Sequence, residues 1–283
     1  MKNQPPEGLK DLKDHKNFKA LDPLGQLLQS YRTSPEPSYK VTNYFEIYVD
    51  LFAHLRGTAC TFVEIGVLNG GSLFMWRDWL GKDARIIGID LNPGALKWRE
   101  HGFEIYIGDQ GNPQFWRETL AKIGPFDALL DDGGHQSFQQ IVTVSEAIRA
   151  ATKKCVIAVE DTITSFMKEF ARHREHTFLK YAKDSTDYLP ARMTHFTPGE
   201  FPKIDNKEGM RDFQSLYSVA FYAGLVAFKI DPASKVRPEL CWNRPLENGK
   251  GASDFRYQGR DAALVDWPDP FMKQQVILHG GPA

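Results

Sequence analysis

The sequence predicts an α/β protein built on a doubly wound, mostly parallel sheet of seven strands. Two observations support this prediction. First, five short apolar runs alternate with helix-like segments between residues 61 and 161, which is typical of parallel strands joined by right-handed helical crossovers. Second, the segment 215–230 contains two β-rich runs separated by Ala223 and Gly224, which predicts a closing antiparallel hairpin.

The predicted elements follow one another in a regular order. Apolar residues at helical spacing, followed by Gly57, predict an amphipathic helix over 41–57. The five parallel strands are expected at 61–67, 84–90, 103–109, 126–132 and 153–161. Helices are expected between them at 70–81, 92–100, 112–124 and 136–151.

The domain organisation is one main domain over residues 41–231, with an extension of 1–40 before it and a tail of 232–283 after it. Within the domain, the segment 162–214 is rich in charged and aromatic residues and has little periodicity. We interpret this segment as a lid over a binding site, and ordinary packing of a long insertion is the alternative. The two ends of the chain could pack against a second copy, as in a homo-oligomer, or against their own domain.

Composition and charge argue against several classes of protein. The 35 Lys and Arg against 36 Asp and Glu leave a formal charge of −1, which gives no net attraction to nucleic acid or to an anionic membrane surface. The sequence has no apolar run of about 18 residues and no signal-peptide core, so we expect neither a membrane span nor export by that route. Two of the three cysteines, Cys60 and Cys155 but not Cys241, lie in apolar runs, which suits free thiols in a reducing cytoplasm.

Each predicted parallel strand ends in at least one acidic residue. In an open parallel sheet, ligands bind beyond the carboxyl ends of the strands, near the point where strand order reverses. One acid at such a position could be a helix N-cap, but five in succession favour a binding site. The acids are Glu64, Asp90, Asp109, the pair Asp131 and Asp132, and the pair Glu160 and Asp161.

The loop after the first strand, EIGVLNGGS, indicates the kind of cofactor. Leu68 stands where a dinucleotide loop needs its second glycine, and no Walker-type lysine follows, so a nicotinamide or nucleoside triphosphate is disfavoured. The glycines allow a ligand to approach the backbone closely, and Asp90 could accept from a ribose diol; both features suit S-adenosylmethionine. For the glycine loop, the alternative is a plain strand-to-helix turn. The predicted cofactor-binding residues are Glu64, Gly66, Gly71, Ser72, Asp90, Asp109, Gln110 and, at the methionine end, Asp131.

The ends of the fourth and fifth strands predict a metal site. Neighbouring strands would bring Asp132, Glu160 and Asp161 together, and close carboxylates repel unless they are protonated or bound to a cation. Oxygen ligands favour Mg²⁺, with Ca²⁺ or Mn²⁺ possible, over zinc. His135 follows Asp132 closely and is predicted to act as a catalytic general base, and a capping or surface histidine is the alternative.

Six blocks of the sequence resemble, in order, one known family. They are FVEIGVLNGGSLFMWRDWLG, IIGIDLNP, IGDQGNPQFW, FDALLDDGGHQSF, VIAVEDTITS and VAFYAGLVAFK. The family is that of class I S-adenosylmethionine-dependent methyltransferases of the mycinamicin type, which act on macrolide sugars and include proteins labelled cephalosporin hydroxylase. The resemblance implies a Rossmann-like methyltransferase domain, S-adenosylmethionine as methyl donor, Mg²⁺ at Asp132, Glu160 and Asp161, and a histidine base at His135. The chain departs from the family at Gly134, where a serine is usual, and at the KKC of 153–155, where a Pro-Gly-Gly turn is common.

The residues and the resemblance together predict a Mg²⁺-assisted O-methyltransferase. Its acceptor would be a small molecule, a sugar or another natural product, that offers a hydroxyl of a vicinal pair. The metal would fix and acidify this hydroxyl while His135 removes its proton. Two alternatives remain. A metal-dependent hydrolase would use the same carboxylates and histidine without needing the glycine loop, and a non-catalytic binding protein would keep only the fold.

Overall fold

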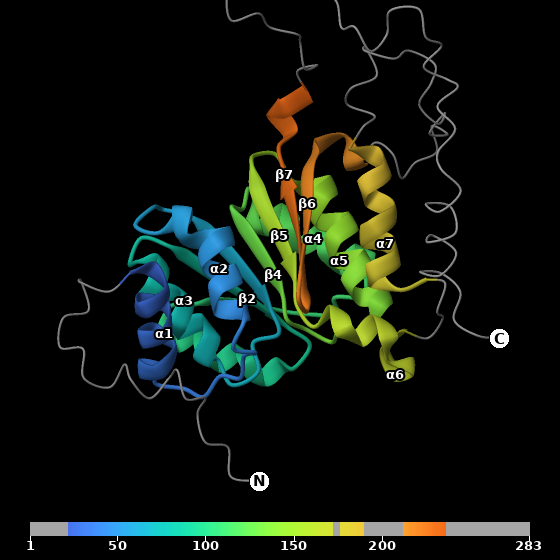
Figure 1. The fold of residues 1–283 in the computed structure, drawn as a ribbon. Helices are drawn as coiled ribbons and strands as arrows, with labels where there is room; N and C mark the ends of the chain where they lie inside the picture. Colours follow the sequence, from blue (N-terminus) through green and yellow to red (C-terminus); the bar gives the residue numbers. More distant parts are fainter. Residues whose placement is uncertain (1–21, 172–175, 190–211, 236–283) are drawn as a thin grey trace, which may run out of the picture. The chain divides into compact units, whose positions relative to one another are not determined.

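The structure is a computed structural model that describes residues 22–171, 176–189 and 212–235. Within these residues, seven strands form one sheet that carries helices on both faces (Figure 1). The remaining parts of the predicted extension 1–40, lid 162–214 and tail 232–283 lie outside the described residues, as does Cys241.

The sheet has the strand order β3-β2-β1-β4-β5-β7-β6, as expected for a doubly wound sheet with a closing hairpin. The four pairs among β1 to β5 are parallel, whereas β7 pairs antiparallel with both β5 and β6. The prediction of a mostly parallel sheet and an antiparallel hairpin is confirmed. The strands are β1 Thr61–Ile65, β2 Arg85–Asp90, β3 Glu104–Ile107, β4 Ala128–Asp131, β5 Cys155–Val159, β6 Leu216–Tyr222 and β7 Leu225–Ile230.

Strand order reverses between β1 and β4, which are neighbours in the sheet although β2 and β3 separate them in the chain. In the parallel register, Ile65 lies opposite Ile89 of β2 and Asp131 of β4. Val159 of β5 in turn lies opposite Asp131. The carboxyl ends of four strands therefore meet at one end of the sheet, where an open parallel sheet binds its ligand.

The helices occupy the predicted intervals. The helix predicted over 92–100 is a 3₁₀-helix, η5, which ends at Gly102 in the left-handed conformation, with φ 82°. The α-helices are α1 Pro23–Thr33, α2 Tyr44–Phe52, α3 Gly71–Leu80, α4 Pro113–Ile123, α5 Ser137–Ala150, α6 Lys168–Ala171 and α7 Phe178–Ser185. The 3₁₀-helices are η4 Ala53–Leu55, η5 Pro93–His101, η6 Thr162–Phe166, η7 Thr186–Tyr188, η9 Asp212–Ser215 and η10 Pro232–Lys235.

Helix α1 lies in the predicted N-terminal extension and packs on the domain itself. The Asp22 carboxylate caps its first turn by accepting from the Gly25 amide at 2.7 Å, and Leu27 is fully buried. α1 contacts α2 and α3 on one face of the sheet, whereas α4, α5 and α7 cover the other face. The described part of the extension thus belongs to the core of the domain.

An aromatic cluster on the α3 face positions the acidic residue of β1. The fully buried Trp76 ring lies 4.6 Å from the ring centroid of Phe62 and 5.0 Å from that of Tyr48. Such pairs contribute about 0.5–1.5 kcal/mol each beyond burial of their area. Trp76 Nε1 donates to Glu64 Oε1 at 3.2 Å, so the packing of this core holds the Glu64 carboxylate in place.

The described aromatic residues of the predicted lid divide into two groups. Phe178 of α7 is fully buried next to Phe228, and Tyr188 stacks on Phe213 with centroids 4.7 Å apart. Packing of an insertion, the alternative considered from the sequence, accounts for these residues. Phe166 of η6 is 77% exposed and remains available for a ligand. Phe196 and Phe201 lie outside the described residues.

Two further expectations concern the thiols and the membrane. Cys60 and Cys155 are buried and free, and burial raises the pKa of the Cys155 thiol to about 12. Among the described residues, every helix is too short or too polar to cross a bilayer.

Candidate active site

A pocket of about 590 Å³ opens at the carboxyl ends of the parallel strands. Eight of the twelve residues predicted for the site line it, namely Gly66, Asp90, Asp109, Gln110, Asp132, His135, Glu160 and Asp161. The other four, Glu64, Gly71, Ser72 and Asp131, lie behind its wall and are each buried. The structure therefore gathers the predicted residues at one place and separates those that face a ligand from those that support them.

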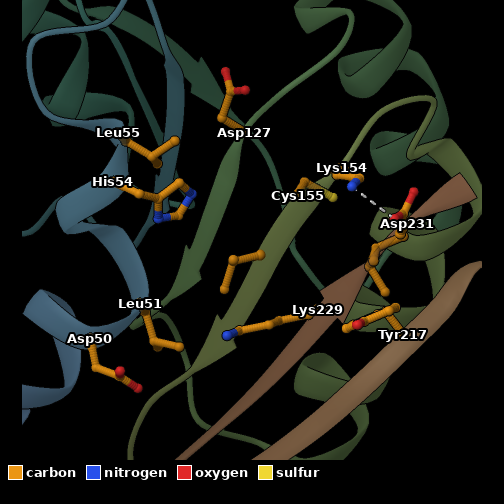
Figure 2. Close-up of a pocket in the computed structure, with 12 residues that line it drawn as sticks. Asp50, Leu51, His54, Leu55, Asp127, Lys154, Cys155, Tyr217, Lys229 and Asp231 are labelled. Atoms are coloured by element: carbon orange, nitrogen blue, oxygen red, sulfur yellow. Dashed lines mark ion pairs between the residues drawn. The ribbon is translucent and has the colours of Figure 1, made fainter. Parts of the chain in front are cut away.

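A second pocket lies at the opposite end of β4 and β5, where these strands begin (Figure 2). Its lining includes Asp127, Cys155 and the ion pair of Lys154 with Asp231, whose atoms are 3.2 Å apart. The twelve predicted site residues, all of which are described, do not line this pocket. The strand-end acids thus single out the first pocket.

Two glycines of the β1 loop are required by close backbone contacts. Gly66 has φ 89°, and a Cβ there would lie 2.0 Å from the Asp132 carbonyl oxygen. A Cβ on Gly71 would lie 2.3 Å from the carbonyl oxygen of Glu36. Gly66 therefore lets β1 approach the end of β4, and Gly71 lets the segment before α2 lie on the start of α3.

Asp90 closes β2 and is held facing the pocket by backbone amides. Its Oδ2 accepts from the amides of Val67 and Leu68 at 2.9 and 3.1 Å, and its Oδ1 accepts from the amide of Asn92 at 2.7 Å. Leu68 adopts φ 47° and is 72% exposed. The carboxylate is therefore fixed in direction, with acceptor capacity left for a ligand because each oxygen carries two lone pairs.

Gln110, which lines the pocket, pairs with Asp131, which is buried behind it. Gln110 Nε2 donates to both Asp131 oxygens at 3.0 and 3.1 Å, and the Gly134 amide donates to Gln110 Oε1 at 2.7 Å. The Gly133 amide also donates to Asp131, at 3.1 Å. Burial raises the pKa of Asp131. Asp131 thus supports the turn after β4 and is buried behind residues that line the pocket, so its contact with the methionine end of a donor stays a prediction.

Glu64 and Ser72 likewise support the site from behind. Ser72 Oγ donates to Glu64 Oε2 at 2.7 Å, while Trp76 and Lys40 contact Oε1. Glu64 is fully buried, and burial raises its pKa. A direct contact of Glu64 or Ser72 with a ligand in this pocket would require their polar groups to exchange these partners.

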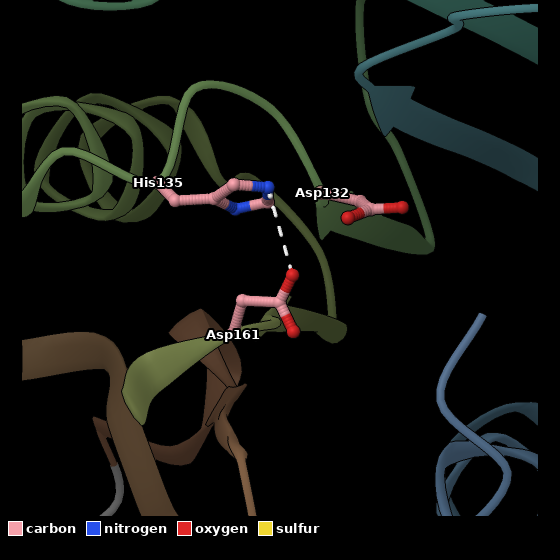
Figure 3. A group of neighbouring side chains, drawn as sticks. All are labelled: Asp132, His135 and Asp161. Carbon is pink, nitrogen blue, oxygen red and sulfur yellow. Dashed lines mark ion pairs between the residues drawn. The ribbon is translucent and has the colours of Figure 1, made fainter. Parts of the chain in front are cut away.

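Three side chains at the ends of β4 and β5 could hold a metal ion together. Asp132, His135 and Asp161 each offer one ligand atom, and these atoms lie within 4.8 Å of one another. Figure 3 shows the His135 ring and the Asp161 carboxylate pointing toward each other, with Nε2 and Oδ2 3.6 Å apart. The two carboxylates suit Mg²⁺ or Mn²⁺, which prefer oxygen ligands. The buried His135 Nδ1 has no hydrogen-bond partner among the described residues, which leaves Nε2 as the ring nitrogen that faces the group.

The backbone at His135 and Asp161 adopts a conformation that is rare for residues other than glycine. Their φ angles are 56° and 53°. The Thr164 hydroxyl lies within hydrogen-bond distance of both the His135 and the Asp161 carbonyl oxygens, at 3.1 and 2.8 Å, and Tyr44 donates to Asp161 Oδ1 at 2.8 Å. Such strain costs about 1–3 kcal/mol per residue and clusters at functional sites. Its presence at both residues supports a functional role for this end of the pocket.

Lys40 is a site residue that the sequence analysis did not find. It enters the acid cluster from the segment before α2, and its Nζ lies 2.6 Å from Asp132 Oδ2. It also lies 3.3 Å from Glu64 and 3.4 Å from Glu160, and its side chain is 1% exposed. A lone lysine outside any motif gives no signal of burial in a single sequence, so only the fold reveals it.

Glu160, predicted as a metal ligand, lies on the inner side of the cluster. It is 1% exposed, Tyr48 donates a short hydrogen bond to its Oε1, and both of its oxygens contact Lys40. Burial raises the pKa of Glu160 to about 8. The structure thus brings Asp132 and Asp161 together with His135 and places Glu160 with Lys40 and Tyr48.

The sheet order, the glycine loop after β1 and the acids ending β2, β4 and β5 define the Rossmann-like methyltransferase fold. No family model matches the chain. The structure is similar to the mycinamicin-pathway methyltransferase MycE, solved in complex with Mg and S-adenosylhomocysteine, with a TM-score of 0.61 and 21% identity over 74% of this chain and 55% of that one. This similarity shows that the two proteins share a fold.

The sequence relatives are named O-methyltransferases. The chain is 31% identical over 192 residues to the 8-demethyl-8-alpha-L-rhamnosyl tetracenomycin-C 2'-O-methyltransferase of Streptomyces olivaceus, covering 65% of this chain and 49% of the relative. It is 30% identical over 120 residues to the demethylmacrocin O-methyltransferase of Streptomyces fradiae, covering 40% of this chain and 29% of the relative. The chain thus matches about half of the first relative and less of the second, and the predicted resemblance to macrolide-sugar methyltransferases is confirmed.

Proposed function

We propose that the protein is an S-adenosylmethionine-dependent, Mg²⁺-assisted O-methyltransferase that acts on a hydroxyl of a sugar or natural product. One observation carries the proposal: a single pocket contains the glycine loop with Asp90 at the end of β2, and the Asp132, His135 and Asp161 group at the ends of β4 and β5. The relatives named for sugar O-methylation support it. A hydrolase would need the second group and not the first.

The donor would lie along the β1 loop, Asp90 and the segment after β3. Asp90 would accept from the ribose hydroxyls, because its backbone hydrogen bonds hold it facing the pocket. Asp109 lines the same pocket, and its Oδ1 accepts from the Gly111 amide at 2.7 Å, which fixes the loop. Gln110 would set the wall between donor and acceptor through its bond to the Gly134 amide. S-adenosylmethionine would supply an electrophilic methyl group there.

The acceptor would lie at the group of Asp132, His135 and Asp161. Asp132 and Asp161 would hold Mg²⁺, which lowers the pKa of a coordinated hydroxyl and orients it. His135 would take the hydroxyl proton at Nε2, because its Nδ1 is enclosed by protein. Asp161 would keep the His135 ring in place, and Tyr44 would in turn hold Asp161 by donating to its Oδ1.

The apolar part of an acceptor has exposed side chains available beside this group. Ile163, Phe166 and Met167 follow Asp161 directly and are 54%, 77% and 41% exposed. Thr164, between them, is buried and donates to the His135 carbonyl oxygen. This hydrogen bond holds the turn that carries the three side chains next to His135. They would contact the acceptor, the role that the sequence analysis gave to a lid over 162–214.

Binding of the donor product tests the proposal directly. Titration calorimetry should show one molecule of S-adenosylhomocysteine bound per chain, and Asp90→Ala should weaken it at least tenfold by removing the ribose acceptor. Asp83→Ala, at an exposed acid paired with Lys82, is the matched control and should bind as the wild type does. Methyl transfer from labelled S-adenosylmethionine to glycosylated polyketides should then depend on added Mg²⁺. Absence of S-adenosylhomocysteine binding would overturn the proposal.

Three coarser expectations accompany this function. A formal charge of −1 gives no net attraction to nucleic acid, and a small hydroxyl acceptor is the partner that the pocket suits. The buried free thiols of Cys60 and Cys155 favour a reducing, cytoplasmic setting. A homo-oligomer stays a prediction that size-exclusion chromatography with light scattering can test.

A further inference from the structure

A lysine ammonium occupies the space between the acids of β1, β4 and β5. Lys40 Nζ lies 2.6 Å from Asp132, 3.3 Å from Glu64 and 3.4 Å from Glu160. An ammonium has three N–H donors, so it can serve one carboxylate with each. Lys40 is therefore the counter-ion at the position where the sequence analysis expected a divalent cation to meet Asp132 and Glu160.

The segment that carries Lys40 is fixed to the domain. Ser34 Oγ donates to the Gly71 carbonyl oxygen at 2.8 Å, and the Tyr31 hydroxyl donates to the Ser38 carbonyl oxygen at 2.9 Å. The lysine side chain is 1% exposed and cannot move into solvent without displacing this segment. The ammonium is thus a built part of the site.

Glu160 is fully engaged on the inner side of the cluster. One of its oxygens accepts from the Tyr48 hydroxyl and both lie 3.4 Å from Lys40 Nζ. Its main-chain carbonyl accepts from Gln140 Nε2 at 3.1 Å, which fixes the peptide that precedes Asp161. Among the described residues, the group of ligand atoms that lie close together contains Asp161 and not Glu160.

We propose that Lys40 is a positioning residue that excludes the metal ion from Glu160 and directs it to Asp132 and Asp161, next to His135. Lys40 binds Oδ2 of Asp132, so the other oxygen of that carboxylate is the one left for a metal. A divalent cation placed between Asp132 and Glu160 would meet the ammonium there, and like charges repel strongly in a partly buried site. This inference rests on the proposed function only in assigning the cation to the methyl-transfer reaction.

Binding of Mn²⁺ alone, followed by electron paramagnetic resonance without donor or acceptor, tests the ligand set. We expect about one Mn²⁺ per chain, with Asp132→Asn and Asp161→Asn each weakening it at least tenfold. Glu160→Gln should change the affinity by less than about threefold. A loss in Glu160→Gln as large as that in Asp161→Asn would make Glu160 a ligand and overturn the inference, whether or not the protein transfers methyl groups.

Lys40→Met tests the role of the ammonium, since it keeps the length of the side chain and removes the charge. With the charge gone, Mn²⁺ should bind at least as tightly as in the wild type, whereas kcat should fall at least tenfold because the ion moves inward toward Glu160. Lys82→Met is the matched control, because Lys82 is 89% exposed, pairs with Asp83 and does not line the pocket. It should change neither quantity.

The double variant Lys40→Met/Glu160→Gln removes the inner ligand together with the charge. It should bind Mn²⁺ at Asp132 and Asp161 again and recover at least part of the lost kcat. A merely structural role of Lys40 would not give this rescue. An unchanged kcat in Lys40→Met, or a fall in Mn²⁺ affinity parallel to kcat, would overturn the inference. If Lys40→Met does not fold, the Glu160→Gln affinity alone decides.

Discussion

Replacing Gly66 by alanine should lower the free energy of unfolding of the domain and weaken ligand binding in the pocket. Gly66 has φ 89°, and its added Cβ would lie 2.0 Å from the Asp132 carbonyl oxygen. The left-handed backbone costs an L-residue about 1–2 kcal/mol. Relieving the overlap with a backbone atom costs a further ~1–3 kcal/mol. The free energy of unfolding should therefore fall by about 2–5 kcal/mol, the sum of the two costs.

Two other glycines separate these costs. Gly102 has φ 82°, and its nearest neighbour for a Cβ is an Arg77 side-chain nitrogen at 3.9 Å, so Gly102→Ala carries the backbone cost alone. Gly71 has no positive φ, but its Cβ would lie 2.3 Å from the Glu36 carbonyl oxygen, so Gly71→Ala carries the overlap alone.

Urea unfolding of the three variants measures each loss, and calorimetry with S-adenosylhomocysteine measures the pocket. Gly66→Ala should lose about as much stability as the other two together, because it alone carries both the backbone cost and the overlap cost. It should also bind the ligand more weakly, because the overlap shifts Asp132. Equal losses in Gly66→Ala and Gly102→Ala would refute the close contact between β1 and β4.

Three further outcomes are expected. His135→Ala should lose about two to four powers of ten in turnover, the usual range for a general base. EDTA should abolish methyl transfer and leave S-adenosylhomocysteine binding intact. Activity that survives both changes would contradict the metal-assisted mechanism. In EDTA, the free energy of unfolding should fall as pH rises from about 4.5 to about 8, because the folded state keeps a proton on Glu160 that the unfolded chain has released. Urea titrations at several pH values measure this slope, and Glu160→Gln should flatten it. In a Cys241→Ser background, a thiol reagent at pH 8 should modify Cys155 only on unfolding, because burial raises the pKa of this thiol to about 12. Rapid modification of Cys155 in the native protein would count against its burial.

The fold could be predicted because its signals are local. Alternating apolar runs and helix-like segments mark the parallel strands, and Ala223 with Gly224 marks the hairpin. The sequence predicted a helix at η5 without its type, because apolar spacing over nine residues does not separate a 3₁₀-helix from an α-helix. Helix α1 was not predicted, although its Asp22 cap, its Pro23 start and the helical spacing of its apolar residues are local signals of the same kind.

The candidate site could be predicted as a set of residues but not as a set of roles. The sequence placed Asp131 in the site, but only the fold shows that Gln110 donates to its carboxylate. The positions of Glu160 and Asp161 depend on the positive φ of Asp161, which sequence periodicity does not contain. Lys40 comes from a chain segment 92 residues before Asp132, and a single sequence gives no measure of such a contact.

The position of Lys40 in the chain has a consequence for biosynthesis. A ribosome makes Lys40 long before Glu160, 120 residues later, and at about 5–20 residues per second this interval is about 6–24 s. During that time the ammonium has no complete set of carboxylates to pair with, and burying it alone is costly. We therefore expect the segment before α2 to complete its docking on the nascent chain only after β5 has emerged, later than its place in the chain suggests.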